Sequence, residues 1–251
     1  MHTDTTASLP VPPVLVEPPN PCGRHLPLYL IGLTGQAGAG KDSCAEALEF
    51  CGFQRLAFAD ALRHEISQAF GIDPRMLTDR ATKETPLQAL SLSRCGDPFF
   101  LHWAVYYCGH SLYEPRSPRW LMQRWGTEYR RRHDPSYWSR QVHNLLTELI
   151  SQGRRRFVVT DVRYTSEEEM LLAFGALILR VIRPGLPALP ADTADHTSER
   201  DHALPAHAVI TNSGTLEDLG QSVIRTVLDV YGWPALQQIR HPIHQIDEAR
   251  P

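Results

Sequence analysis

A strand, a glycine-rich loop and a helix follow one another between residues 28 and 50, and this succession constrains the fold more than any other stretch. The apolar run 28–34 leads into the loop Gly35-Gln-Ala-Gly38-Ala-Gly40-Lys41, which has G-x-x-x-x-G-K spacing, and a helical pattern covers 43–50. Glycines let backbone N–H groups converge on phosphate oxygens, and the positive end of the following helix favours the same anion. The pattern predicts a phosphate-binding loop in an α/β domain. A plain tight turn between strand and helix is the simpler alternative.

Lysine is rare in this chain. It occurs only at positions 41 and 83, so twenty-three of the 25 lysines and arginines are arginine. A lysine kept at the end of the glycine loop therefore indicates a specific need for a slender point charge, which in such loops reaches the β- and γ-phosphates of a nucleoside triphosphate. We expect the loop residues Gln36, Ala37 and Ala39 to offer backbone groups to the same phosphates.

The residue after the lysine is unusual. Loops of this kind carry serine or threonine there, with a hydroxyl that contacts Mg²⁺, whereas this chain has Asp42 and places Ser43 one position later. A carboxylate is also a hard oxygen ligand for Mg²⁺, and Ser43 is then available to an α-phosphate oxygen. An acid that complements the positive end of the helix dipole is an equally weighted explanation of Asp42.

Composition excludes several classes of protein. A formal net charge of −3 over 251 residues gives no overall basic field, so nucleic acid is not the expected partner. The five cysteines form no C-x-x-C pair, which argues against a zinc site or a disulfide framework and favours a reducing cytoplasm. No apolar run reaches the ~18 residues of a membrane span, and the N-terminus has no signal-peptide pattern.

The order of elements predicts one main domain. Residues 1–27, with seven prolines, are interpreted as a flexible leader, 28–233 as the domain, and 234–251 as a tail. Strands are predicted at 28–34, 53–59, 156–160, 176–182 and 208–210, and helices at 43–51, 61–70, 166–174 and 216–231. Residues 61–150 are mainly helical in pattern. Alternating strands and helices favour a five-stranded, mostly parallel sheet with helices on both faces and a helical insertion.

Several polar residues follow predicted strands. Asp60, Asp161 and Arg183 stand at such positions, as does the glycine loop, and the carboxyl ends of parallel strands meet at one rim where ligands bind. Asp161 is therefore a candidate to orient Mg²⁺, with a helix N-cap as its alternative. Arg163 is a candidate to contact a phosphate, with an ordinary surface arginine as its alternative.

Residues 119–132 mix arginine with aromatic side chains, and Trp138 follows. Such a stretch suits a nucleic-acid surface or an acceptor nucleotide, whose base would stack on the aromatics and whose phosphate would pair with arginine. Gly126 and Thr127 are expected to interrupt the helix where backbone could approach a ligand. A solvated arginine face over a tryptophan core is the structural alternative.

Taken together these motifs resemble a known family. The G-K-D loop, Phe58-Ala-Asp60-Ala-Leu-Arg63, Gln123 with Gly126-Thr-Glu128 and Arg131, Thr160-Asp161-Val-Arg163-Tyr, and His196-x-Ser198-Glu199 resemble the bacteriophage-type deoxynucleoside monophosphate kinases over about residues 28–231. The resemblance implies a P-loop kinase fold and transfer of the ATP γ-phosphate to a deoxynucleoside 5′-monophosphate (dNMP), in the host cytoplasm if the protein is phage-encoded.

The same resemblance implies roles for individual residues. Catalysis would rest on Lys41, Asp161 and Arg163, with Mg²⁺ handled by Asp42 and Asp161. ATP would be held by the loop residues 35–43 and Arg183. The acceptor would be held by Asp60, Arg63, Gln123, Arg124, Gly126, Thr127, Glu128 and Arg131, with helical elements closing over it to exclude water. A homodimer is plausible, and the resemblance gives no role to His196, Ser198 or Glu199.

Other functions are compatible with the loop. A dephospho-coenzyme A kinase would share the loop and the late Asn-x-Gly, although G-K-S/T is expected there. A kinase acting on a modified base in DNA would suit the arginine-aromatic stretch. A nucleotide-binding module without catalysis would bind ATP without acceptor-dependent turnover.

Overall fold

The computed structural model describes residues 27–79, 81–186 and 204–232. The predicted leader, the C-terminal tail and the segment with His196, Ser198 and Glu199 lie outside the described residues. The chain divides into two compact units. The sheet unit comprises Met1–Leu56 and Gly153–Pro251, and the helical unit comprises Ala57–Gln152.

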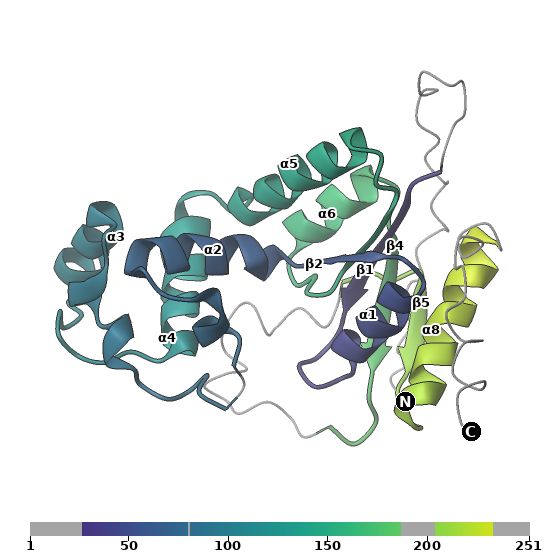
Figure 1. Ribbon diagram of the computed structural model, residues 1–251, viewed down its shortest axis with the longest axis horizontal. Coiled ribbons are helices and arrows are strands. Elements are labelled where there is room, and N and C mark those ends of the chain that lie inside the picture. The colour runs from purple at the N-terminus through teal and green to yellow at the C-terminus, as the bar shows by residue number, and fades with distance from the viewer. Residues whose placement is uncertain (1–26, 80, 187–203, 233–251) are drawn as a thin grey trace, which may run out of the picture. The chain divides into compact units, whose positions relative to one another are not determined.

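The sheet unit contains a single five-stranded sheet among its described residues, and every pairing in it is parallel. The strand order is β2-β3-β1-β4-β5, with β1 in the centre (Figure 1). The strands are β1 (Tyr29–Thr34), β2 (Gln54–Leu56), β3 (Arg156–Val159), β4 (Leu177–Ile182) and β5 (Ala208–Thr211), and the helices are α1 (Lys41–Phe50), α6 (Thr165–Ala173) and α8 (Leu216–Tyr231). The predicted α/β fold is confirmed.

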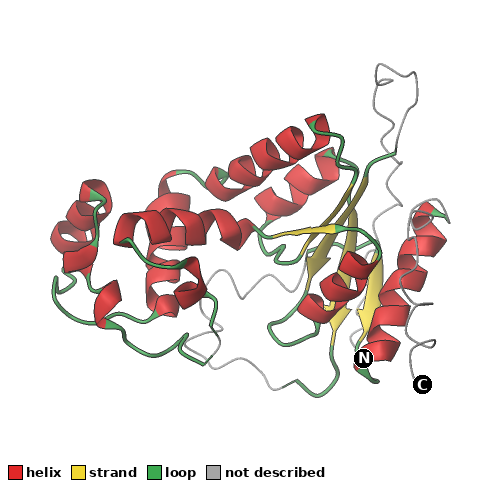
Figure 2. Ribbon diagram, in the orientation of Figure 1, coloured by secondary structure: helices red, strands yellow, loops and turns green. Residues whose placement is uncertain are grey.

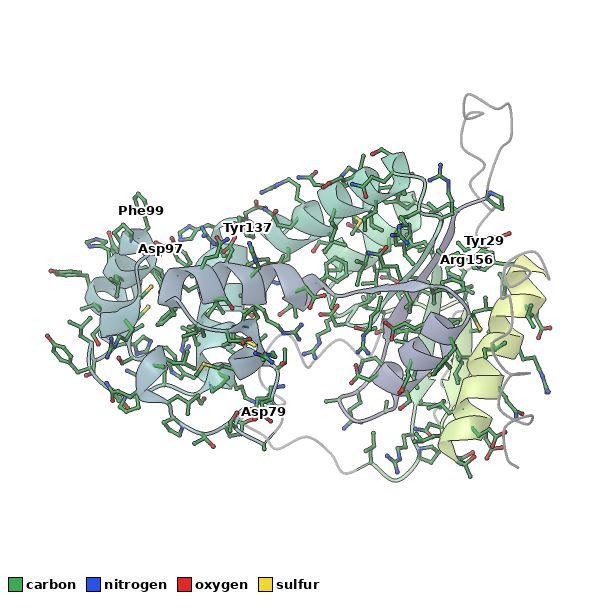
Figure 3. The ribbon with its side chains drawn as sticks, in the orientation of Figure 1. Tyr29, Asp79, Asp97, Phe99, Tyr137 and Arg156 are labelled. Atoms are coloured by element: carbon green, nitrogen blue, oxygen red, sulfur yellow. The ribbon has the colours of Figure 1, made fainter. Side chains whose placement is uncertain are left out.

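Alternate residues of β1 face opposite sides of the sheet, which is why all six of its residues are apolar or small and buried. On one side Ile31 and Leu33 join a core with α1 and α8, which pack against each other (Figure 1). On the other side a Cβ at Gly32 would stand 2.8 Å from Ile178 and 3.0 Å from Leu171 of α6. A glycine at this position lets α6 approach the sheet closely. At the amino end of the strand, Tyr29 lies opposite Arg156 of β3 (Figure 3).

The second strand is shorter than predicted. It ends at Leu56 rather than Ala59, and α2 (Phe58–Phe70) begins at the buried Phe58 after an extended Ala57. Asp60 therefore lies in the first turn of α2 and not at the end of a strand, which corrects the expectation that it follows β2 directly. The apolar run 56–59 is a strand end followed by a helix start, and alternation alone does not separate the two.

The helical unit consists of helices, turns and loops in its described residues, apart from one isolated antiparallel bridge between Leu87 and Arg116 (Figure 2). After α2 come η1 (Pro74–Leu77), η2 (Gln88–Leu90), η3 (Leu92–Arg94), α3 (Pro98–His102), η4 (Trp103–Tyr107), α4 (Pro118–Gln123), η5 (Arg124–Arg131) and α5 (Tyr137–Ser151). Proline begins three of these helices, as its fixed φ and missing N–H favour at a first helical position. Both η4 and η5 are π-helices, which the sequence did not predict.

The core of the helical unit is aromatic. Phe100, Trp125 and Trp138 are almost wholly buried and pack with aliphatic side chains of α2 and of the short helices. Phe99, next to Phe100, is instead exposed at the surface (Figure 3). Among the described residues no helix combines the length and apolar character that a membrane crossing needs.

Candidate functional site

The glycine loop connects the central strand β1 to α1. Gly35, Gly38 and Gly40 have φ values of 133°, 82° and 111°, which residues with a Cβ rarely adopt. At Gly35 a Cβ would stand only 2.2 Å from the backbone oxygen of Val181 in β4. The loop therefore needs glycine for its conformation and, at Gly35, for its close approach to the neighbouring strand.

Lys41 is the first residue of α1 and reaches back over the loop. Its Nζ donates hydrogen bonds to the carbonyl oxygens of Gly35, at 2.7 Å, and Gln36, at 2.9 Å. The N-cap of α1 is Gly40, which has no side chain that could accept a hydrogen bond from the first N–H groups of the helix. An ammonium group and a helix N-terminus thus occur together at the loop, which is the combination that binds phosphate.

Asn212, directly after the edge strand β5, holds the loop in place. Its side-chain Nδ2 donates to the carbonyl of Ala39 at 2.9 Å, and its backbone N–H donates to Ile182 at 2.7 Å. A Cβ at Gly40 would stand 2.7 Å from that same Nδ2. This buried asparagine was not among the predicted site residues; its position directly after β5 and the Asn-x-Gly motif at 212–214 were the available signals.

Asp161 follows β3, the neighbour of β1. The backbone N–H of Thr160 donates to Leu56 and that of Val162 to Leu33, each at 3.1 Å. These bonds hold Asp161 at the carboxyl end of β3, next to the carboxyl end of β1, where the glycine loop starts. The alternative that Asp161 caps the next helix is wrong, because the N-cap of α6 is Tyr164.

Arg163 stands in a turn that a buried carboxylate fixes. Glu167, which is 1% exposed, accepts hydrogen bonds from the backbone N–H groups of Arg163 at 2.8 Å and Tyr164 at 3.1 Å. No sequence motif marks Glu167 as functional, yet this carboxylate determines the course of the chain directly after Asp161.

Arg183 follows β4 on the other side of β1 and is exposed. The backbone N–H of Leu186 closes a turn onto the carbonyl of Arg183 at 3.4 Å, and the Leu186 side chain lies 3.6 Å from the place a Cβ would occupy at Gly38. The turn that carries Arg183 is therefore next to the glycine loop. The loop, Asp161 and Arg183 all lie at one edge of the sheet.

Asp42 lies in the first turn of α1 and forms an ion pair with Arg55 of β2. Its side chain is 57% exposed, so the carboxylate is accessible from solvent. The position is consistent with a metal ligand and with an acid at the positive end of a helix, so both explanations stand. Ser43 follows in the same turn.

The predicted acceptor residues belong to the helical unit. On α2, Asp60 pairs with Arg63 at 2.6 Å. On η5, Arg124 pairs with Glu128 one turn later. Gln123 ends α4, directly before η5, while Thr127 and Arg131 are half-buried residues of η5.

Neither Gly126 nor Thr127 interrupts the helix, which corrects the expectation for both residues. Gly126 lies within η5 and is buried, and a Cβ there would stand 2.9 Å from Leu62 of α2. Its carbonyl accepts a hydrogen bond from Nε1 of Trp138 at 3.0 Å. The glycine thus allows η5 to approach α2, and its carbonyl is already engaged by a core side chain.

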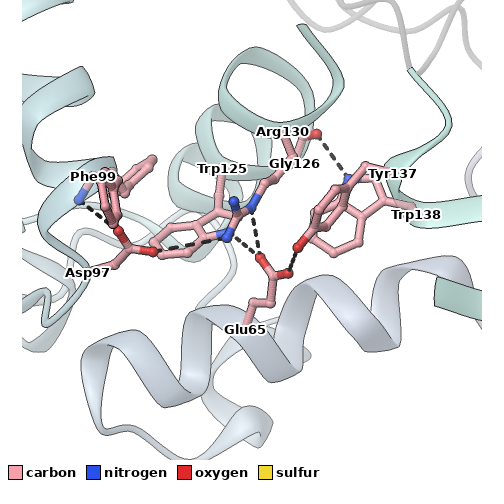
Figure 4. Close-up of polar contacts among 9 residues, drawn as sticks. Glu65, Asp97, Phe99, Trp125, Gly126, Arg130, Tyr137 and Trp138 are labelled. Atoms are coloured by element: carbon pink, nitrogen blue, oxygen red, sulfur yellow. Dashed lines mark hydrogen bonds and ion pairs between the residues drawn. The ribbon is translucent and has the colours of Figure 1, made fainter. Parts of the chain in front are cut away.

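The arginine-aromatic stretch is in part structural. Trp125 and Trp138 are core residues, as the structural alternative expected. Arg130 pairs with Glu65 of α2 (Figure 4). Its guanidinium lies over the rings of Tyr129 and Tyr137. Glu65 is another residue that sequence reasoning missed, since nothing in a helical stretch marks which acid faces a core.

Comparisons with known proteins point to one family. The family model of deoxynucleotide monophosphate kinases matches residues 109–223. A protein of Acanthamoeba polyphaga mimivirus, described provisionally as a deoxynucleotide monophosphate kinase, is 24% identical over 211 residues, covering 80% of this chain and 96% of that protein.

Solved structures give weaker likenesses. A dephospho-CoA kinase from Campylobacter jejuni has a TM-score of 0.42 at 12% identity, covering 80% of this chain and 97% of that one. TT1252 from Thermus thermophilus scores 0.43 at 19% identity, with coverage of 80% and 97%. A shikimate kinase from Acinetobacter baumannii scores 0.35 at 17% identity, with coverage of 80% and 94%. Scores this low say nothing about what this chain binds.

Proposed function

We propose that the chain is a deoxynucleotide monophosphate kinase, whose sheet unit holds ATP and whose helical unit holds the dNMP that accepts the γ-phosphate. The match to this family model supports ATP and nucleotide substrates. The observation that carries the proposal is the glycine loop of β1, with Lys41 folded over its carbonyls and α1 beginning at that residue.

The donor site is built from groups that attract a polyphosphate. Lys41 supplies a point charge for the β- and γ-phosphates, and the N-terminus of α1 supplies backbone N–H groups. Arg183 stands in the turn beside Gly38, on the flank of the loop. We assign ATP binding to Gly35, Gln36, Ala37, Gly38, Ala39, Gly40, Lys41, Asp42, Ser43 and Arg183.

Two carboxylates suit Mg²⁺. Among the described residues, no group of three or more His, Cys, Asp and Glu side chains is arranged to hold a metal ion. A nucleotide-bound Mg²⁺ needs no such group, since it typically takes one or two carboxylates, phosphate oxygens and water. Asp42, exposed on α1, and Asp161, at the end of β3, provide hard oxygen ligands of this kind. When bound, the ion would neutralise charge on the phosphates.

The acceptor assignment rests on the family motifs. We assign acceptor binding to Asp60, Arg63, Gln123, Arg124, Gly126, Thr127, Glu128 and Arg131. Gly126 contributes through packing rather than through a free backbone, because Leu62 and Trp138 already contact it. The arginines provide charge for the acceptor phosphate.

Phosphoryl transfer requires little covalent chemistry from the protein. Lys41 orients the donor and draws charge from the γ-phosphate, and Arg163 neutralises charge that develops between donor and acceptor. Glu167 fixes the backbone that carries Arg163. Positioning and charge stabilisation, with water excluded, account for the catalysis.

The test is an acceptor-dependent assay with the purified chain. ADP and dNDP are measured after incubation with ATP and each dNMP, and separately with dephospho-coenzyme A, shikimate and modified duplex DNA. Formation of dNDP is expected. If product forms only with DNA or only with dephospho-coenzyme A, that compound is the acceptor and the dNMP proposal is wrong. ATP binding without turnover would indicate a non-catalytic module.

Two variants separate the donor and acceptor sites. Lys41→Ala is expected to abolish transfer while the fold is retained. Lys83→Ala, which replaces the other lysine, is the matched control and should keep wild-type turnover.

Arg131→Ala is expected to raise the KM for dNMP or to lower kcat, while ATP binding is kept. Arg75→Ala serves as its control, because that side chain is 90% exposed and pairs only locally with Asp73. Normal turnover by Lys41→Ala would refute the role given to the loop.

A further inference from the structure

Glu65 of α2 collects three hydrogen bonds from two other elements. Its Oε2 accepts from Nε1 of Trp125 at 2.9 Å and from Nε of Arg130 at 3.0 Å, and its Oε1 accepts from the hydroxyl of Tyr137 (Figure 4). Trp125 and Arg130 belong to η5 and Tyr137 to α5. One carboxylate therefore connects three helices of the same unit.

The group is largely shielded from water. The side chains of Glu65 and Arg130 are 23% and 26% exposed. The Arg130 guanidinium lies 4.8 Å from the ring centre of Tyr129 and 4.9 Å from that of Tyr137, and Asp97 stands 4.0 Å away on its other side. Because Glu65 is paired with Arg130 and accepts from three donors, this is a defined polar network rather than a flexible surface pair.

The spacing of two of these donors matches the π-helical form of η5. In an α-helix, residues five apart point about 140° away from each other round the axis, since each residue turns by about 100°. In a π-helix the hydrogen bonds run between residues five apart, which brings such residues to the same face. Trp125 and Arg130 are five apart and meet at the same oxygen of Glu65, an arrangement that the π-helix permits and a regular α-helix does not.

The π-helix also determines where the remaining residues of η5 point. With Trp125 and Arg130 on the face toward Glu65, Thr127 and Arg131, which are four apart, share a different face of the same helix. The backbone of η5 is held a second time at Gly126, which packs on Leu62 and accepts from Trp138. π-Helices are rare and often lie at functional sites, and this one carries five of the eight proposed acceptor residues.

We propose that Glu65 is a positioning residue, which holds η5 in its π-helical turn so that Thr127 and Arg131 are presented to the acceptor nucleotide. The inference rests on the proposed function, because the acceptor role of η5 is part of that proposal. Glu65 itself does not contact the substrate. It acts through Arg130 and Trp125, which bear none of the proposed acceptor contacts.

The test replaces the carboxylate with an apolar side chain of similar size. Glu65→Leu leaves the Trp125, Arg130 and Tyr137 donors without their acceptor. Glu65→Gln keeps an oxygen that accepts from Trp125 and Arg130, and its amide N–H can donate to the hydroxyl oxygen of Tyr137. Because a displacement of about 1 Å can cost about 100-fold in rate, we expect Glu65→Leu to lower kcat/KM for dNMP by about 10- to 100-fold. The KM for ATP should change by less than about twofold, and Glu65→Gln should restore most of the loss.

Two further measurements separate positioning from a general loss of structure. Glu84→Leu, which removes the ion pair with Arg119 in the same unit, is the matched control and should retain wild-type kinetics. In a double-mutant cycle, Glu65→Leu combined with Arg131→Ala should lose much less than the product of the single losses, because both act through the same presentation of Arg131. If Glu65→Leu does not fold, Arg130→Lys, which lacks the Nε donor, should show the same selective loss with dNMP.

The outcomes are distinct. Wild-type enzyme that phosphorylates no dNMP would overturn the proposed function itself. Active wild-type enzyme together with an unchanged dNMP KM and kcat in Glu65→Leu would overturn the positioning role alone. Multiplicative losses in the cycle, or an equal loss of ATP affinity, would also contradict it, because they indicate a structural effect that is not directed at the acceptor.

Discussion

The substitution Gly35→Ala tests whether the glycine loop depends on close approach to β4. The φ of 133° at Gly35 lies in a region that residues with a Cβ avoid, at a cost of about 1–3 kcal/mol. The added Cβ would also stand 2.2 Å from the backbone oxygen of Val181, and forcing such an atom into a packed interior costs about 1–3 kcal/mol. Because that neighbour is backbone, no side chain can move aside to relieve the contact.

The two contributions together amount to about 4 kcal/mol. For a chain of this size each kcal/mol lowers Tm by about 2–4 °C, so Gly35→Ala should lower Tm by about 8–16 °C. Gly153→Ala is the matched control in the same unit, since Gly153 has a φ of 88° but nothing within 4 Å of a Cβ. Its cost is the backbone conformation alone, about 1–2 kcal/mol.

Thermal melts of both variants, with and without ATP, measure the difference. Gly35→Ala should melt well below Gly153→Ala and gain little from ATP, because the distorted loop no longer presents its backbone to phosphate. Equal melting temperatures for the two variants would refute the argument that the contact with Val181 requires glycine. A full stabilisation of Gly35→Ala by ATP would refute the role of this glycine in the donor site.

Two other predictions follow from the sheet unit and the core. Asn212→Ala removes a buried hydrogen bond to the Ala39 carbonyl. We expect denaturant titrations to show a loss of about 1–3 kcal/mol in unfolding free energy, and binding titrations to show a weaker ATP affinity. Wild-type ATP affinity in this variant would contradict the role of Asn212 in holding the loop. Burial raises the pKa of Cys44 to about 12 and that of Cys95 to about 11, so both stay protonated at pH 8, where iodoacetamide should label them only after unfolding. Rapid labelling of Cys44 in the folded protein would show that the helix behind the loop opens.

Local patterns in the sequence were sufficient for much of the sheet unit. The apolar run before Gly35, the G-x-x-x-x-G-K spacing and the β-branched run before Asp161 each involve neighbours in the chain, and their physical consequences are local. Strand burial on both faces gives an apolar run, and a left-handed turn demands glycine. The five strands, the parallel sheet and the edge where the loop and Asp161 lie were therefore predictable.

The tertiary structure alone decided which residues support these groups. Asn212 reaches Ala39 across 173 positions, and Arg130 reaches Glu65 across 65, so no local pattern marks either pair. The periodicity of residues 124–131 likewise does not predict that η5 is a π-helix. It is consistent with Trp125 and Arg130 sharing a single carboxylate and with Gly126 packing against Leu62, both of which involve α2. The sequence by itself determined that a phosphate loop and a run of arginines exist, whereas folding determined which of those arginines face a core carboxylate, because that choice depends on contacts between distant helices.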